Sequence, residues 1–393
     1  MSASFNPPPM EKVQRTSLMV GGVFMLLLLL GALLNHNQFF QSYLIGFTFW
    51  TGIAVGSVAL LMLQHLTGGG WGFVIRRVLE ASTRTLPLMA LLFIPIILGA
   101  HSLYPWTHAE ELAKYPVVRG KTAYLNLTFF SIRAVVYFGV WLALAYFLNK
   151  WSLEQDRTGD KWFTKAMRVI SGPGMVFLIF AVTFAAIDWY MSLEPEWAST
   201  IYGFIYVAAW GLSALAFVIA IMAWLSKEPP MNRIVAPMHF HDHGKLLLAM
   251  VMLWAYFAFS QYLIIWSGNL PEEIAWYLKR THGVWGAIAL LVVILHFAFP
   301  FLFLLSRNLK RDPHKLVMVA LLLLVMRFID LLWMLKPAFT GGSFSLSWMD
   351  VVSPIAFGGL WLAFFFWQLS RRSLIPINDP EFESVLEQAH EGH

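Results

Sequence analysis

The chain has 393 residues, of which 59% are hydrophobic and only 12% are charged, and its mean hydropathy is +0.65. Soluble domains carry about 25% charged residues, so this composition excludes a water-soluble protein and predicts that lipid is the main solvent. Cysteine is absent, which excludes disulfides, covalent c-type haem attachment, iron–sulfur clusters and cysteine-ligated zinc in this chain.

Ten stretches approach the roughly 20 apolar residues that a membrane-spanning helix needs. The sequence therefore predicts one all-α integral membrane domain over residues 1–393, with an N-terminal segment (1–16), a transmembrane region (17–370) and a tail (371–393). The first stretch ends without a small-x-small cleavage pattern, so we expect a helix there and not a signal peptide. The ten predicted spans are residues 17–34, 40–65, 84–103, 126–148, 169–191, 200–226, 244–267, 281–306, 314–335 and 348–370.

Lysine and arginine are distributed unevenly between the two sets of connections, with 19 on one side and 6 on the other. The richer side is expected to be cytoplasmic, which predicts that both chain ends lie inside the cell. On that side, residues 71–83 are expected to form a helix lying on the membrane. The acidic tail from Asp379 is expected to be solvated or held against a partner.

An internal repeat is indicated by the middle eight spans, because spans 2–5 and 6–9 form two equal sets that each begin outside. Spans 5 and 9 occupy matching places, and each carries an aspartate and a tryptophan near its outer end: Asp188 with Trp189, and Asp330 with Trp333. The pattern predicts two four-helix bundles related by an axis along the membrane normal, with spans 1 and 10 at their flanks.

Four fully charged residues lie within the predicted spans: Arg133, Asp188, Arg327 and Asp330. Each costs about 2.5–3.5 kcal/mol near a helix centre, so each is expected to find a partner or water. At about 1.5 Å per residue all four fall in the outer half, with Arg327 about 12 Å deep. One interpretation is that they only form ion pairs, Arg327 with Asp330 on one helix face and Arg133 with Asp188 between helices.

The other interpretation is a buried polar pocket that opens towards the outer leaflet. A quinol oxidised in this pocket would release its protons outside. In this catalytic set Asp188 accepts a proton, His101 provides a hydrogen bond and Arg133 tunes the carboxylate. A cofactor-binding set of Arg327, Asp330 and His282 lies at similar depth.

The histidines do not predict a b-type haem, which needs two of them on facing helices at one depth. His65 and His296 lie towards the cytoplasmic ends of spans 2 and 8, but their depths differ by about 8 Å. His101 and His282 match in depth but lie at the interface. We therefore expect no haem, metal or iron–sulfur centre in this chain.

Residues 237–243 (PMHFHDH) resemble a metal-binding tract. Asp242 can equally cap the helix that follows, and the histidines can lie in the headgroup region. A third interpretation is a protonatable cluster at a channel mouth. The predicted proton path then comprises His65, Glu80, His239, Asp242 and His296.

Several stretches carry a family resemblance: residues 188–197 (DWYMSLEPEW), 244–273, 52–56 and 65–69. They resemble the NrfD-like quinone-interacting membrane subunits of alternative complex III, a quinol oxidoreductase that passes electrons to a periplasmic acceptor. The resemblance covers nearly the whole chain. The short chain and compact loops are more similar to the ActF type, quinone-binding subunit 2, than to the ActC type.

The resemblance implies a ten-helix fold with two four-helix bundles, in the inner membrane of a bacterium. It implies a quinone or quinol as the bound cofactor, and as partners an ActC-like membrane subunit, an iron–sulfur subunit, cytochrome c subunits and small membrane subunits. The chain itself then contributes a quinol-site-like pocket, a proton path, or both.

Other functions fit the same pattern. One is the NrfD- or PsrC-type anchor of another respiratory reductase. Another is a secondary transporter, since ten helices with an internal repeat suit that class, although the sequence has no matching pair of Gly/Pro-broken spans. A third is a scaffold whose polar residues only pair.

Overall fold

The computed structural model describes residues 7–114, 116–385 and 387, and every regular element in these ranges is helical. Ten helices in them are long and apolar enough to cross a membrane, which confirms the predicted number. They are α1 (Glu11–Leu34), α2 (His36–Thr67), α3 with α4 (Gly70–Thr83 and Leu86–Leu98), α8 (Leu127–Thr158), α9 (Lys161–Trp189), α10 (Tyr202–Leu225), α11 (Pro237–Gly268), α13 with α14 (Gly283–Val292 and Phe299–Leu305), α16 (Pro313–Thr340) and α17 (Trp348–Leu369).

Shorter elements connect these helices. A π-helical segment, Val293–Ala298, joins α13 to α14. The remaining elements are α5 (Ala100–Leu103), α6 (Ala109–Lys114), α7 (Pro116–Gly120), α12 (Pro271–Thr281), α15 (Arg307–Arg311) and the 3₁₀ turns Pro105–Thr107, Met191–Leu193 and Met231–Arg233.

The starts of several long helices follow from side-chain caps. An oxygen of the preceding residue accepts a hydrogen bond from a backbone N–H of the first turn, where that group has no partner within the helix. The capping residues are Asn35, Asn126, Asp160, Asp312 and Ser347.

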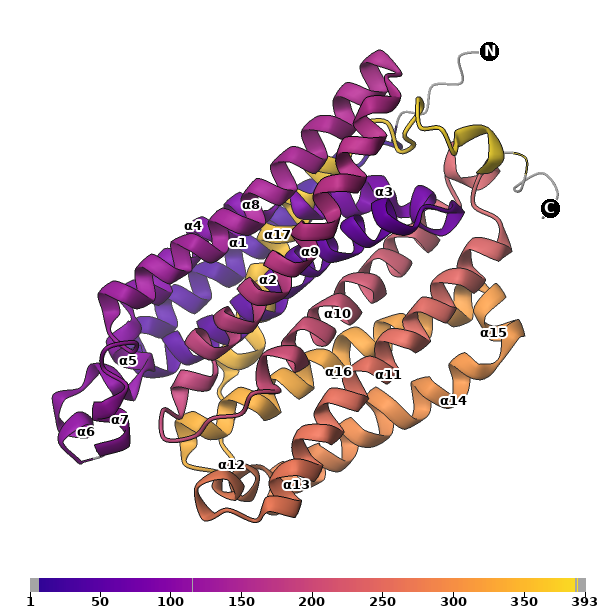
Figure 1. Cartoon of the computed structure of the whole chain (residues 1–393). Helices are drawn as coiled ribbons and strands as arrows, with labels where there is room; N and C mark the ends of the chain where they lie inside the picture. Colours follow the sequence, from indigo (N-terminus) through magenta and orange to yellow (C-terminus); the bar gives the residue numbers. More distant parts are fainter. Residues whose placement is uncertain (1–6, 115, 386, 388–393) are drawn as a thin grey trace.

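The long helices lie roughly side by side, with α5–α7 and α12 towards one end and α3 and α15 towards the other (Figure 1). The start of α1 lies beside the end of α17, because Gly21 contacts Gly359 and Gly31 contacts Met349. We call the end with α3 and residues 372–385 the tail side, and the end with α5–α7 and α12 the loop side.

The centre of the assembly is formed by α2 and α10, which are more buried than the other eight candidate spans. They approach closely, since a Cβ on Gly56 would lie 2.1 Å from the backbone oxygen of Trp210. The peripheral helices expose large apolar side chains, as Leu33 (84% exposed) illustrates. Ten apolar helices with such outward faces identify a multi-pass membrane protein.

Three expectations need correction. The helix predicted at residues 71–83 forms as α3, but residues 72–83 are all buried within the protein, so it does not lie on a membrane surface. The PMHFHDH segment is the first part of α11, whose N-cap is Ala236, so Asp242 does not cap it. Helix α16 continues to Thr340, beyond the predicted end at residue 335.

The extension of α16 changes the depth of Arg327. The residue lies about 20 Å from the loop-side end of this 28-residue helix, near its middle, at about 1.5 Å per residue. Arg327 therefore lies farther from the loop-side end of its helix than the predicted end at residue 335 implied, because Pro337 sits in the last turn and does not end the helix.

Candidate functional site

Arg133 of α8 and Asp188 of α9 form a bidentate ion pair on the loop side. The Nε of Arg133 donates to Oδ2 of Asp188 at 2.7 Å, and Nη2 donates to Oδ1 at 3.0 Å. Tyr137, one turn further along α8, also donates its hydroxyl to Oδ2 at 2.6 Å. Asp188 is fully buried, so these three hydrogen bonds replace the hydration that its charge requires.

Tyr124 connects this ion pair to a cavity. The guanidinium of Arg133 lies 3.7 Å from the centre of the Tyr124 ring, and its Nη1 donates to the Tyr124 carbonyl at 2.9 Å. Burial, with the Asp188 carboxylate nearby, raises the pKa of Tyr124 to about 12, so the phenol stays protonated at neutral pH.

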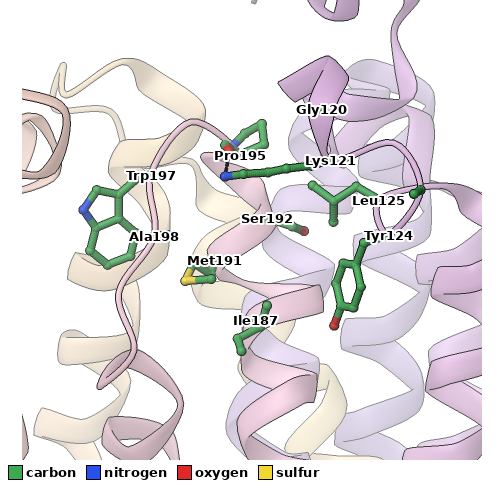
Figure 2. A pocket seen from close by; sticks show the side chains of 11 residues that line it. Gly120, Lys121, Tyr124, Leu125, Ile187, Met191, Ser192, Pro195, Trp197 and Ala198 are labelled. Atoms are coloured by element: carbon green, nitrogen blue, oxygen red, sulfur yellow. Dashed lines mark hydrogen bonds between the residues drawn. The ribbon is translucent and has the colours of Figure 1, made fainter. Parts of the chain in front are cut away.

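The cavity has a volume of about 380 Å³, within the range of small-molecule sites (Figure 2). Tyr124 and Lys121 line it from the loop before α8, and Ile187, Met191 and Trp197 from the end of α9 and the residues after it. Lys121 donates to the carbonyl of Pro195 at 2.6 Å, and burial lowers its pKa from the usual value. A mainly apolar wall with a few polar groups suits a flat aromatic head group.

Aromatic side chains cover the protein-facing side of the ion pair. Trp189, next to Asp188, is fully buried and lies 4.5 Å from Phe93 and 5.8 Å from Phe138 between ring centres. Trp141 packs edge-to-face on Trp189 at 5.8 Å. This wall keeps water out and strengthens the electrostatic interactions of Asp188.

The structure brings Arg133 and Asp188 together, but it does not place His101 or His282 with them. His101 is exposed, hydrogen-bonds to the Thr107 hydroxyl at 3.2 Å and stacks on His108 at 4.0 Å. His282 is exposed and hydrogen-bonds to the carbonyl of Leu278 at 2.9 Å. Within the described residues, neither histidine has a hydrogen bond to a charged member of the predicted sets.

Arg327 and Asp330 pair with each other on α16, as one of the two interpretations predicted. Both are buried, and the ring of Trp254 on α11 lies 4.1 Å from that of His296 in the π-helical segment beside them. The structure therefore groups His296 with the cofactor-binding pair, whereas the sequence assigned it to the proton path.

Glu80 lies in a buried ion network on the tail side. It accepts hydrogen bonds from Arg76 at 3.3 Å, from Arg77 at 2.6 Å and from Ser152 at 2.5 Å. The tail closes this network, because Asp379 pairs with Arg76, and Glu381 accepts from the backbone N–H of Gly69 at 2.9 Å. Residues 379–381 of the acidic tail are thus bound to their own chain.

Of the other residues of the predicted proton path, His65 lies within electrostatic range of Glu80, whereas His239 and Asp242 have other partners. His239 accepts a hydrogen bond from the Ala236 N–H at 3.0 Å, and Asp242 pairs with Lys245 at 3.0 Å at an exposed position. His65 is half-buried near the tail-side end of α2. Its Nε2, like that of His239, has no hydrogen-bond partner among the residues that the structure describes.

Two buried charge clusters on the loop side escaped the sequence analysis. Lys336 pairs with Asp350 at 3.0 Å, and Ser42 and Gln38 of α2 also donate to Asp350, at 2.7 and 3.1 Å. Lys336 lay one residue beyond the predicted end of its span. The sequence contains a signal for this pair, because Lys336 and Asp350 are opposite charges near the facing ends of two consecutive predicted spans.

The second cluster is centred on Glu194, within the DWYMSLEPEW stretch. It accepts from Lys279 at 2.7 Å and from Arg280 at 2.5 Å, both on α12. Arg280 is buried with its guanidinium 3.8 Å from the Trp276 ring centre. These contacts fix the segment that lines one side of the cavity.

No group of three or more potential metal ligands occurs within residues 7–114, 116–385 and 387. Comparison with known protein families found no family model that matches the chain, and comparison with curated proteins found no significant match. A functional assignment therefore depends on the geometry of the site and on the sequence motifs.

Proposed function

We propose that the chain is a membrane subunit of a quinol:electron-acceptor oxidoreductase complex of the alternative complex III type, and that the cavity beside Asp188 receives a quinol head group. The observation that carries this proposal is the position of the cavity. It adjoins a fully buried carboxylate held by Arg133 and Tyr137, in a chain with few charged residues in its spans.

The proposed chemistry divides between this chain and its partners. Oxidation of a quinol to a quinone releases two protons and two electrons. The electrons pass to a haem or iron–sulfur centre in a partner subunit. One proton passes to Asp188 and the other to water at the loop side, and Arg133 turns towards the cavity as the Asp188 carboxylate becomes neutral.

Tyr124 and Lys121 serve as the polar contacts of the head group. The ring of Tyr124 lines the cavity and covers Arg133, and its protonated phenol lies beside Asp188, so that this side chain can link the head group to the carboxylate. The amine of Lys121 lies at the opposite polar edge, against the carbonyl of Pro195.

The proposal includes two four-helix bundles and an orientation with both chain ends inside a bacterial inner membrane. The packing supports such a grouping, since α2, α4, α8 and α9 contact one another in a ring, as do α10, α11, α13–α14 and α16. The partners proposed are an ActC-like membrane subunit, an iron–sulfur subunit, cytochrome c subunits and small membrane subunits.

The experiment is purification of the native complex through an affinity tag on this chain, followed by spectroscopy. We expect c-type haem and iron–sulfur signals to co-purify, and added quinol to reduce the haem. Addition of quinone in place of quinol is the control and should leave the haem oxidised. A preparation that carries no redox centre and does not bind quinol would overturn the proposal in favour of a transporter or scaffold.

A further inference from the structure

Four side chains from three elements meet near the middle of the spans. Trp254 of α11, His296 of the π-helical segment and Arg327 of α16 each lie about 20 Å from the loop-side ends of their helices. Asp330 lies one turn from Arg327 on the same face. Both α11 and α16 pack against the π-helical segment, so the cluster joins three neighbouring elements.

Buried polar atoms in this cluster lack partners. His296 is completely buried, and neither of its ring nitrogens has a hydrogen-bond partner among the described residues; the same holds for Nε of Arg327. A buried polar group without a partner is destabilising, so native proteins usually satisfy such groups with an ordered water. The location of His296 in a π-helical segment also favours a functional role for this cluster, since π-bulges occur frequently at functional sites.

The polar atoms suffice to hold water. A buried water needs two to four polar partners, and His296, Arg327 Nε and the Asp330 carboxylate together offer that number. We propose that His296, Arg327 and Asp330 form a water-containing proton-binding site near the middle of the membrane, in which His296 receives the proton and Asp330 changes its partner.

The charges define the two states of this site. In the structure Asp330 pairs with Arg327, so the two charges neutralise each other, and neither ring nitrogen of His296 has a hydrogen-bond partner among the described residues. A proton that arrives on a ring nitrogen of His296 creates a second cation within electrostatic range of Arg327. The carboxylate of Asp330 then turns towards the imidazolium through the water, and no covalent bond other than N–H is made.

The groups around the site allow this exchange. Trp254 faces both the imidazole and Asp330 from α11, and its ring can stabilise an imidazolium. The titratable groups near the ion pair on other helices are Tyr202 and Tyr206 of α10, with their hydroxyls 3.4 Å apart, and Tyr277 of α12. Helices α13 and α14 bring no charged residue to the segment. The site shares no residue with the cavity beside Asp188, so it does not depend on the proposed quinol chemistry.

The test is a pH titration of the full chain in lipid nanodiscs, followed by infrared difference spectroscopy with isotope-labelled histidine. We expect one of the twelve histidines to titrate together with a carboxylate band. His296→Gln should abolish this coupled signal. Asp330→Asn should remove the carboxylate band and move the midpoint of the histidine signal to lower pH by about 1–3 pH units, because the opposite charge is gone. The control His282→Gln, at an exposed histidine, should leave it unchanged.

A second measurement keeps the test decisive if a variant does not fold. High-resolution imaging of the unmodified chain should show an ordered water within hydrogen-bond distance of His296. A dry site, or a coupled signal that persists in His296→Gln, overturns the proposal.

Discussion

Arg133 and Asp188 lie 55 residues apart in the sequence and meet through two parallel hydrogen bonds of 2.7 and 3.0 Å. The aspartate is fully buried, whereas the side chain of the arginine keeps 12% of its surface exposed. This difference in exposure allows the ion pair two roles. The pair ties α8 to α9, and it gives the arginine access to water while the carboxylate stays buried.

The first prediction concerns Asp188→Asn, which keeps the side-chain shape and removes the negative charge. If the pair only ties helices, stranding Arg133 should cost about 3–5 kcal/mol and the complex should dissociate. We expect instead that the complex assembles, because Arg133 can reach water, and that it oxidises quinol slowly. Assembly is measured by size-exclusion chromatography and turnover by quinol oxidation.

The double variant Asp188→Asn with Arg133→Gln separates these roles. It should assemble as well as the unmodified chain and remain slow in turnover. Normal turnover together with normal proton release in an intact Asp188→Asn complex would show that Asp188 takes no part in the chemistry.

The second prediction concerns the buried pair of Lys336 and Asp350. Lys336→Met strands Asp350 in a fully buried position and should destabilise the protein by about 3–5 kcal/mol. Lys336→Met with Asp350→Leu should recover much of that loss, because no uncompensated charge remains. Chemical denaturation in detergent measures both.

Lys245→Met is the matched control for this prediction. Lys245 and Asp242 are also 3.0 Å apart, but both side chains are more than a third exposed, so little change in stability is expected. Equal losses at the buried and exposed pairs would contradict the account of Lys336.

The ten spans could be predicted because each is an apolar run near the length that a bilayer requires, and the sequence marks both ends with polar or capping residues. The ends were less certain where a polar residue continues a helix. Lys336 and Pro337 suggested a stop, yet α16 includes both, since Asp350 neutralises the lysine from α17. The resulting error placed Arg327 too near the loop-side end of its helix.

The site was predictable only in part. The charges of Arg133 and Asp188 stood out against an apolar background, and the structure joins them. Grouping by depth could not show that His101 points to Thr107, or that His296 packs on Trp254, because the direction of a side chain depends on helix rotation. The sequence also could not predict the contacts of the tail with α3, since they join residues about 300 positions apart.

The third prediction concerns the contact between α1 and α17. A Cβ on Gly21 would lie 2.4 Å from the backbone nitrogen of Leu360, so Gly21→Ala should push the two helices apart at a cost of about 1–3 kcal/mol. Gly22→Ala is the control, because a Cβ there meets nothing within 4 Å and alanine favours the helix. Thermal denaturation should rank Gly21→Ala below Gly22→Ala, and the reverse order would contradict this packing.

The fourth prediction concerns orientation, and the absence of cysteine allows single-cysteine labelling. Cysteines at Thr200 and Ser343, both exposed on the loop side, should react with an impermeant reagent in intact cells. Ser192, although on the same side, is unsuitable because it is buried. A cysteine at Ser384 should react only after the cells are opened, and its labelling in intact cells would reverse the proposed topology.

The central claim is that this chain itself contacts the quinol, and cross-linking of a photoreactive quinone analogue tests it most directly. The intact complex is illuminated with the analogue, digested and mapped by mass spectrometry, with excess unlabelled quinol as the competitor. We predict competable labelling within residues 120–125 and 187–198, which line the cavity beside Asp188. Labelling confined to partner subunits, with none on this chain, would contradict the account.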